Sequence, residues 1–268
     1  MKINKIAIDG IIGGLMFAIF SYFTSIFDND PKYLKISAFV WGVPLFYFYL
    51  VYITWSKSKS AMIEFTKHAY KSGANYGLVV TPYYNKPTQS GLLAHYNELI
   101  KNSNKPIIIY DIPGRSIIKM SDDTMAELAN TDLIVGVKDA TADLARPTRL
   151  LNLIGEDFIQ LSGEDGTALA YLAAGGHGCI SVTANIAPNL LSRMHNAWKQ
   201  GDINTTQEIN KKLMPLHDAL FCETSPGPLK YAASLLGLCT SQARLPIVEI
   251  EESSKKNVHN ALKKVGLL

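Results

Sequence analysis

The chain has 268 residues, of which 47% are hydrophobic and 18% charged, and its formal net charge at pH 7 is +3. This composition excludes a disordered chain, a collagen and a coiled coil, and the small positive charge gives no support for a nucleic-acid partner. Three cysteines far apart in the sequence argue against a disulfide scaffold and a zinc site, so we expect an ordinary globular protein of one or two domains.

The first 57 residues differ in composition from the rest of the chain. They hold more than half of the aromatic residues, and the runs 11–27 and 36–55 carry no charged side chain. A helix of about 20 apolar residues is long enough to cross the hydrocarbon layer of a membrane. The polar segment 28–35, which contains a proline, separates the two runs. The pattern predicts a transmembrane helical hairpin over residues 1–57, embedded in the membrane through residues 11–55.

This hairpin also determines the predicted localisation. Lysines flank both apolar runs, and their numbers slightly favour placing both ends of the hairpin in the cytoplasm. We therefore expect a membrane-anchored protein whose following domain is cytoplasmic. The alternative is a pair of buried helices in a soluble domain, in which case the whole protein would be cytoplasmic.

From residue 58 onward, strand-like and helix-like segments alternate. Short apolar runs predict five strands, at 76–81, 106–110, 133–138, 158–162 and 178–182. Helical apolar spacing follows each of them, at 88–102, 121–130, 144–153, 166–174 and 188–199. Strands that are apolar on both faces are typical of a parallel sheet covered by helices, so we expect α/β architecture, either a doubly wound sheet or a (β/α) barrel.

The last part of the chain is predicted to be helical throughout. Apolar periodicity indicates helices at 204–220, 227–236 and 253–264. The predicted domains are accordingly a hairpin over 1–57, an α/β region over 58–203 and a helical region over 204–268.

Polar side chains recur where the predicted strands end. Thr81, Tyr110, Lys138, Ser162 and Thr183 each occupy such a position. A barrel brings the carboxyl ends of its strands together around one mouth and builds its active site there. The sequence contains neither GxGxxG nor GxxxxGK[ST], so a nucleotide-binding open sheet has no support. The strand ends therefore favour a barrel-type site.

Lys138 is the strongest single candidate for chemistry. It closes the apolar run 134–137, so its aliphatic stem should be buried. A desolvated ammonium loses its proton readily, and the neutral amine can attack a ketone to form a Schiff base. Tyr110 ends an earlier strand, and its hydroxyl could transfer protons to such an imine. The structural alternative is a lysine that extends from a strand end into solvent, with Tyr110 as a core aromatic.

Several separate motifs resemble those of the dihydrodipicolinate synthase family. The likeness runs in order from about Ala61 to the C-terminus. It is carried by the segments 80–89 (VTPYYNKPTQ), 110–115 (YDIPGR), 136–141 (GVKDAT), 161–165 (LSGED), 176–185 (GHGCISVTAN) and 213–217 (LMPLH). This family belongs to the pyruvate-dependent aldolases, with N-acetylneuraminate lyase, and the resemblance implies a (β/α)₈ barrel fold with a C-terminal helical region.

The resemblance also implies catalytic roles for three residues. Lys138 matches the lysine that binds pyruvate as an imine, whose enamine then attacks L-aspartate 4-semialdehyde on the route to diaminopimelate and lysine. Tyr110 matches the proton-transfer tyrosine above the imine. Tyr84 matches the relay tyrosine that one subunit lends to its neighbour, and Tyr83 an interface tyrosine. We therefore expect a homo-oligomer or an assembly with other barrel subunits of the family.

Three further positions match the family's substrate pocket. Arg115 corresponds to the arginine that binds the carboxylate of the aldehyde substrate, a task suited to a bidentate guanidinium. Gly163 and Ile180 correspond to positions that shape the pocket. The chemistry implies no metal and no organic cofactor, because an amine and proton relays suffice.

The predicted fold class is thus an incomplete (β/α) barrel. Five strands after residue 58 leave the first three β-α units of the family without counterparts, and the predicted hairpin stands in their place. Besides the synthase reaction, two functions remain open at this point. One is a catalytically inactive, membrane-tethered family module that binds other subunits. The other is a sister pyruvate aldolase that uses a different aldehyde.

Overall fold

The predicted strands form one parallel sheet. The computed structural model of the chain describes residues 59–268. All neighbouring strands are parallel and follow one another in sequence order. The strands are β1 (Gly77–Val80), β2 (Ile107–Asp111), β3 (Ile134–Asp139), β4 (Ile159–Ser162) and β5 (Gly178–Cys179). This order means that each connection returns to the adjacent position, as in successive β-α units.

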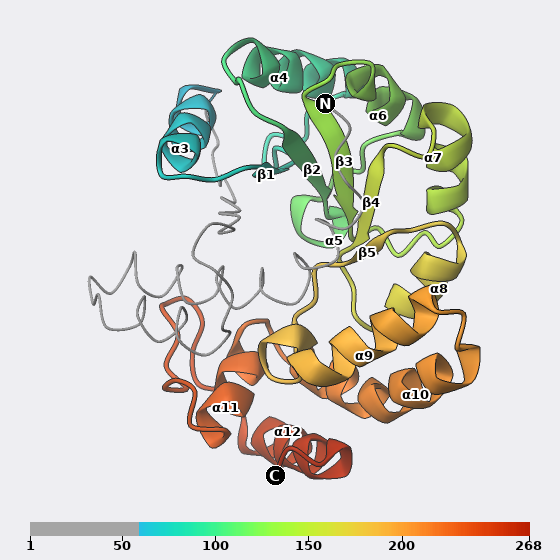
Figure 1. Ribbon diagram of the computed structural model, residues 1–268. Helices are drawn as coiled ribbons and strands as arrows, with labels where there is room; N and C mark the ends of the chain where they lie inside the picture. The colour runs from blue at the N-terminus through green and yellow to red at the C-terminus, as the bar shows by residue number, and fades with distance from the viewer. Residues whose placement is uncertain (1–58) are drawn as a thin grey trace. The chain divides into compact units, whose positions relative to one another are not determined.

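Helices precede and connect the strands. They are α3 (Lys59–Lys71), α4 (Gln89–Lys101), the short α5 (Pro113–Ser116), α6 (Asp122–Ala129), α7 (Arg146–Ile154) and α8 (Ala168–Ala173). Those whose buried residues pack on the sheet (α3, α4, α6 and α7) cover one of its faces. Figure 1 shows α4, α6 and α7 side by side along the sheet, and α6 packs on both of its neighbours. The hydroxyl of Thr88 accepts a hydrogen bond from the Gly91 N–H, and Ser121 accepts one from Thr124 N–H. These side chains satisfy backbone donors at the starts of α4 and α6.

The two faces of the sheet bury different apolar clusters. Val79, Ile107, Ile109 and Val137 lie on the helix-covered face, where they pack with buried residues of α4, α6 and α7. On the other face, a smaller cluster consists of Leu78, Ile108, Ile159, Leu161 and Ile180, with Tyr110 packed against it. Because successive strand residues point to opposite faces, β1 and β2 each contribute to both clusters.

The described residues divide into two compact units after Ile180. The second unit contains the 3₁₀ turn η1 (Thr183–Asn185) and the helices α9 (Pro188–Lys199), α10 (Ile203–Leu220), α11 (Gly227–Leu235) and α12 (Glu252–Val265). Within this unit α10 packs against α9 and α12, and residues such as Leu213, Leu216 and Leu262 are fully buried. The predicted domain boundary after residue 203 stays a prediction.

The predicted fold class was wrong in its membrane part. Within residues 59–268, no helix combines the length and the apolar character needed to cross a bilayer. The residues assigned to the hairpin, 1–57, lie outside the described part of the chain. We therefore drop the transmembrane hairpin from the fold, and with it the membrane partner and the membrane-anchored localisation. The prediction relied on the length of uncharged runs, and interior helices of globular proteins can also be apolar all round.

Candidate functional site

Two adjacent strand ends bring Lys138 and Tyr110 together. The parallel register of β2 and β3 pairs Tyr110 with Lys138, so both side chains project from the same face of the sheet. The ammonium nitrogen of Lys138 lies 4.1 Å from the centroid of the Tyr110 ring. Leu161 of β4 is the next residue in this row. The sequence prediction that these strand ends meet is in agreement with this geometry.

The Lys138 side chain is held in a dry environment. Only 7% of the residue is exposed. Burial lowers the pKa of its ammonium to about 8; the acidic groups of Cys179 and Asp165 act in the opposite direction, whereas the positive charge of Arg115 lowers the pKa further. Because the neutral amine is the nucleophile, a lysine of this kind is reactive at a pH where an ordinary lysine is fully protonated.

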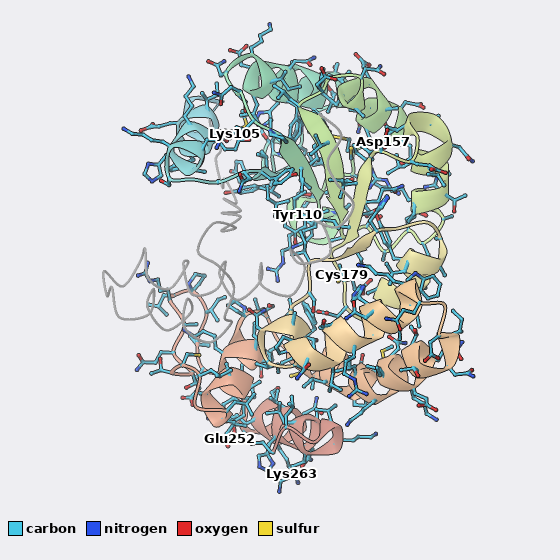
Figure 2. All side chains as sticks on the ribbon, viewed as in Figure 1. Lys105, Tyr110, Asp157, Cys179, Glu252 and Lys263 are labelled. Carbon is cyan, nitrogen blue, oxygen red and sulfur yellow. The ribbon has the colours of Figure 1, made fainter. Side chains whose placement is uncertain are left out.

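Tyr110 is a protonated phenol next to this amine. Burial raises the pKa of Tyr110 to about 12, and the positive charge of Arg115 opposes the rise. The phenol therefore keeps its proton near neutral pH and can donate it to an oxygen or nitrogen that gains charge. Figure 2 labels Tyr110 at the end of β2 and Cys179 on β5.

Arg115 lies on a single helical turn, from which its charge acts on both Tyr110 and Lys138. Pro113 starts α5 directly after β2, and the Ser116 hydroxyl donates to the Ile112 carbonyl oxygen at 2.9 Å, which fixes this turn. The charge of Arg115 acts on both Tyr110 and Lys138, although the residue itself is exposed. A guanidinium in this position is available to an anionic ligand near the amine.

Gly163 allows the backbone to approach Lys138 closely. A Cβ atom at this position would lie 2.8 Å from the Cβ of Ala140 and 3.3 Å from Cε of Lys138. The Gly163 N–H donates to the Asp139 carbonyl oxygen at 2.6 Å. Ile180 is buried in the apolar cluster that Tyr110 contacts. Gly163 therefore borders the Lys138 side chain directly, whereas Ile180 belongs to the apolar cluster beside Tyr110.

Tyr84 differs from these residues in its surroundings. It follows β1, and 78% of its surface is exposed. Its φ angle of 56° lies in the left-handed region, which is uncommon for a residue other than glycine. The structure thus brings Lys138, Tyr110 and Gly163 together. Arg115 acts on Lys138 and Tyr110 through its charge, Ile180 lies in the cluster beside Tyr110, and Tyr84 is exposed.

Sequence reasoning missed three residues near this site. Asp165 and Cys179 are buried and influence the pKa of Lys138, and the fully buried Arg146 binds Asp111, the residue after Tyr110. Asp165 and Cys179 were visible only inside the family motifs, without a role. No local pattern singles out Arg146, because its partner lies 35 positions away in the sequence.

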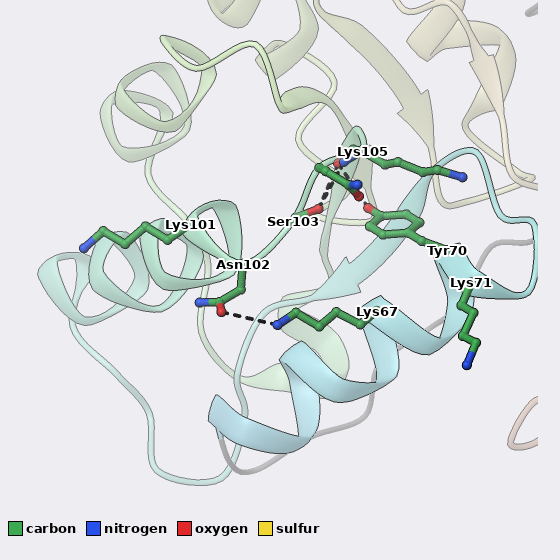
Figure 3. Close-up of a pocket in the computed structure, with 8 residues that line it drawn as sticks. Lys67, Tyr70, Lys71, Lys101, Asn102, Ser103 and Lys105 are labelled. Atoms are coloured by element: carbon green, nitrogen blue, oxygen red, sulfur yellow. Dashed lines mark hydrogen bonds between the residues drawn. The ribbon is translucent and has the colours of Figure 1, made fainter.

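A cavity of about 590 Å³ lies at the other end of the sheet. Lys67, Tyr70, Lys71, Lys101 and Lys105 are among its lining residues, and they belong to the segments that precede β1 and β2. Figure 3 shows the side chains of Lys71 and Lys101 pointing away from each other, while Lys67 donates to Asn102. These ammonium groups do not converge on one point. Lys138 and Tyr110 lie at the opposite, carboxyl ends of the strands.

Comparisons with known proteins agree with this arrangement. The family model described as Dihydrodipicolinate synthetase family matches residues 50–265. The 4-hydroxy-tetrahydrodipicolinate synthase of Rhodospirillum centenum is 57% identical over 215 residues, which cover 80% of this chain and 74% of that protein. The relative's name is that of a lyase.

Solved structures show the same likeness. The chloride-inhibited dihydrodipicolinate synthase of Acinetobacter baumannii in complex with pyruvate has a TM-score of 0.80 at 36% identity and covers 88% of this chain and 79% of its own. The enzyme of Cyanidioschyzon merolae with lysine bound has a TM-score of 0.84 at 28% identity, and the match covers 99% of this chain and 93% of that one.

The family model matches more than half of the chain. The Rhodospirillum centenum relative is 57% identical over most of both sequences. The predicted enzyme class, a carbon–carbon lyase similar to 4-hydroxy-tetrahydrodipicolinate synthase, is therefore confirmed at the level of the family. The chain belongs to the dihydrodipicolinate synthetase family.

Proposed function

We propose that this chain is a Schiff-base lyase that condenses pyruvate with L-aspartate 4-semialdehyde, in the biosynthesis of diaminopimelate and lysine. The observation that carries the proposal is the buried Lys138 amine, whose pKa is lowered to about 8, held 4.1 Å from the centroid of the Tyr110 ring. The family supplies the reaction class, and this geometry supplies the nucleophile and its proton-transfer partner.

The first half of the reaction forms an imine and then an enamine. The neutral amine of Lys138 adds to the keto carbon of pyruvate, and the keto oxygen leaves as water as the C=N bond forms. Loss of a proton from the methyl carbon then gives the enamine. Tyr110 delivers a proton to the departing oxygen, a role for which its protonated phenol is suited.

The second half forms the carbon–carbon bond. The enamine carbon attacks the aldehyde carbon of the second substrate, and the resulting alkoxide takes a proton while the C=N bond is restored. The amino group of the semialdehyde then attacks the imine carbon, so that the adduct cyclises and the Lys138 amine leaves. Arg115 binds the carboxylate of the aldehyde through its guanidinium. Gly163 and Ile180 shape the pocket, and Tyr84 extends the proton relay from a neighbouring subunit of a homo-oligomer. The steps use an amine and proton relays, so the proposal includes no metal or organic cofactor.

Reduction of the imine tests the proposal directly. The full chain is incubated with pyruvate, treated with borohydride and digested. We expect mass spectrometry to find one reduced pyruvyl group on the peptide that contains Lys138, and Lys138→Ala to abolish it. Absence of any adduct at saturating pyruvate would show that the chain is not a pyruvate-dependent aldolase. The remaining hypothesis would then be a catalytically inactive module of the family.

A panel of aldehydes then tests the second substrate. With pyruvate fixed, we expect L-aspartate 4-semialdehyde to give the highest kcat/KM, and Arg115→Lys to reduce kcat/KM for this aldehyde while leaving pyruvate trapping intact. A different aldehyde as the best substrate would identify a sister aldolase instead.

A further inference from the structure

The residues that follow Tyr110 and Lys138 form a second pair, on the opposite face of the sheet. Asp111 ends β2 and Asp139 ends β3, and the register of the two strands pairs them directly. Because side chains alternate along a strand, Asp111 and Asp139 point toward the helices while Tyr110 and Lys138 point to the other face. Both carboxylates are buried.

A single arginine joins this pair. Arg146, the first residue of α7, is completely buried, and its Nη1 lies 2.8 Å from Oδ2 of Asp111 and 3.6 Å from Oδ1 of Asp139. Its Nη2 donates to the Met120 carbonyl oxygen at 2.8 Å, and its Nε to Oδ1 of Asp122 at 2.9 Å. One guanidinium therefore connects the ends of β2 and β3 to the start of α6.

Stability alone does not explain this arrangement well. Burial of charges is unfavourable, and well-packed apolar residues often replace a buried ion pair without loss. A cation in the first turn of a helix also faces the positive end of the helix dipole. Oδ1 of Asp111 and Oδ2 of Asp139 are buried and have no hydrogen-bond partner in the described chain. Arg146 pairs with both carboxylates, whose other oxygens also accept one backbone N–H each, from Met120 at 3.2 Å and from Thr141 at 2.9 Å. Such a costly network is expected where it fixes one specific geometry.

We infer that Arg146 is a positioning residue that holds the ends of β2 and β3 in the register that places Lys138 against Tyr110. The inference rests on the proposed function for its catalytic meaning. Asp111 directly follows Tyr110 in the sequence, and Asp139 directly follows Lys138. A shift of either strand end therefore moves the Lys138 amine relative to the Tyr110 phenol. Misplacement by about 1 Å is enough to cost up to about 100-fold in rate.

A conservative exchange with a matched control tests this inference on the full chain. Arg146→Lys keeps the charge but removes the planar fork that reaches four partners at once. Arg149→Lys is the control, because Arg149 also binds Asp122, at 2.6 Å, but its side chain is 44% exposed. We expect borohydride trapping of pyruvate to be about tenfold slower in Arg146→Lys and within about twofold of the unchanged chain in Arg149→Lys.

A second readout needs no pyruvate. The pH dependence of Lys138 acetylation by acetic anhydride, followed by mass spectrometry, reports the protonation of this amine. Tyr110, Arg115, Asp165 and Cys179 are the groups that face or influence it, and they are unchanged in both variants. We expect the midpoint to rise toward that of an ordinary lysine in Arg146→Lys, because loosened strand ends admit water, and to stay unchanged in Arg149→Lys.

The outcomes separate the two proposals. If Arg146→Lys folds and matches Arg149→Lys in both trapping rate and acetylation midpoint, Arg146 has only a structural role and the inference is wrong. If the unchanged chain traps no pyruvate, the proposed function is wrong. The pH midpoint of Lys138 acetylation then tests by itself whether Arg146 positions the strand ends. If Arg146→Lys does not fold, Asp122→Asn replaces it: we expect trapping about threefold slower, and an unchanged rate would overturn the inference.

Discussion

At the scale of single residues, the site depends on opposing influences on one amine. Burial lowers the pKa of Lys138, whereas Asp165, Cys179 and the face of the Tyr110 ring favour its charged form. Burial has the largest influence, so the balance yields an amine with a pKa of about 8. This value provides neutral nucleophile near physiological pH and still permits protonation in later steps.

The lowered pKa of Lys138 predicts a specific pH profile. Only the neutral amine attacks pyruvate, so the rate of imine formation should rise with pH and level off above about pH 8, where the amine is mostly deprotonated. Rapid-mixing measurements of imine formation between pH 6 and 10 would check this. A rate that continues to rise up to pH 10 would indicate an ordinary, solvated lysine.

The Tyr110 phenol is predicted to act in proton transfer. Tyr110→Phe keeps the ring against Lys138 and removes the hydroxyl, so turnover should fall by roughly 10²–10⁴-fold while the thermal stability changes little. The control is Tyr70→Phe, because the Tyr70 hydroxyl donates to backbone carbonyl oxygens at the other end of the sheet. Equal losses in both variants would show that the effect of Tyr110→Phe is structural.

Gly163 is predicted to be required for the placement of Lys138. In Gly163→Ala the new methyl group would clash with Ala140 and press on Cε of Lys138, so pyruvate trapping should slow by about tenfold. Overpacking of this kind also destabilises a fold by about 1–3 kcal/mol. Gly114→Ala is the matched control, because a Cβ at Gly114 has no atom within 4 Å. A normal trapping rate in Gly163→Ala would contradict the close approach.

At the scale of elements, periodicity predicted most of the fold. The strands and helices of residues 76–268 begin and end within one or two residues of their predicted limits, with two exceptions. The fifth strand ends at Cys179 instead of residue 182, because the Ser181 hydroxyl accepts a hydrogen bond from Ala184 and turns the chain into η1. The second exception is α5, a helical turn over Pro113–Ser116 for which the sequence analysis predicted no helix.

The candidate site was predictable only in part. Tyr110 and Lys138 could be found because polar residues at the ends of buried parallel strands gather at one edge. The hydrogen bonds of Arg146 to Asp122 and Asp111 could not, since they join segments 24 and 35 residues apart and leave no periodic signal in the sequence. The same holds for the fit of Gly163 against Lys138, which depends on the spacing between β3 and β4.

The pairing of β3 with β4 provides a prediction about an element. A Cβ on Gly136 would collide with the backbone carbonyl of Ile159 on β4, and backbone cannot move aside as a flexible side chain can. Gly136→Ala should therefore separate the strands and destabilise the protein by about 3 kcal/mol or more. Urea unfolding of this variant beside Gly114→Ala would measure the difference. A cost below about 1 kcal/mol would mean that the strands can separate locally without loss.

At the scale of the whole molecule, the chain shares most of its length with its relatives. The family model matches residues 50–265, and the sequence resemblance was predicted to begin near Ala61. The Rhodospirillum centenum relative is covered to 74% of its length. The described residues hold two compact units, each with its own buried core. Lys138 and Tyr110, the proposed nucleophile and proton-transfer residue, both lie in the first of them.

The exposure of Tyr84 leads to a prediction about assembly. A phenol that is 78% exposed, on the turn after β1, is suited to reach a site in another subunit. Consider a homodimer in which each subunit contributes Tyr84 to the site of its partner. The Lys138→Ala subunit lacks the nucleophile but still contributes Tyr84, whereas the Tyr84→Phe subunit keeps the nucleophile but contributes no tyrosine hydroxyl. Each variant alone should be inactive or nearly so.

Co-expression of the two variants should then restore activity. Random pairing makes half of the dimers hybrids, and each hybrid has one complete site, so about a quarter of the activity of the unchanged protein is expected. Tandem purification on two different tags isolates the hybrids, in which about half of the activity should return. The control is the pair Lys138→Ala and Tyr110→Phe. These two residues contact each other within one chain, so every site of the hybrid lacks one of them and no activity should return. Purified hybrids with no more activity than this control would show that Tyr84 serves its own subunit or no site at all.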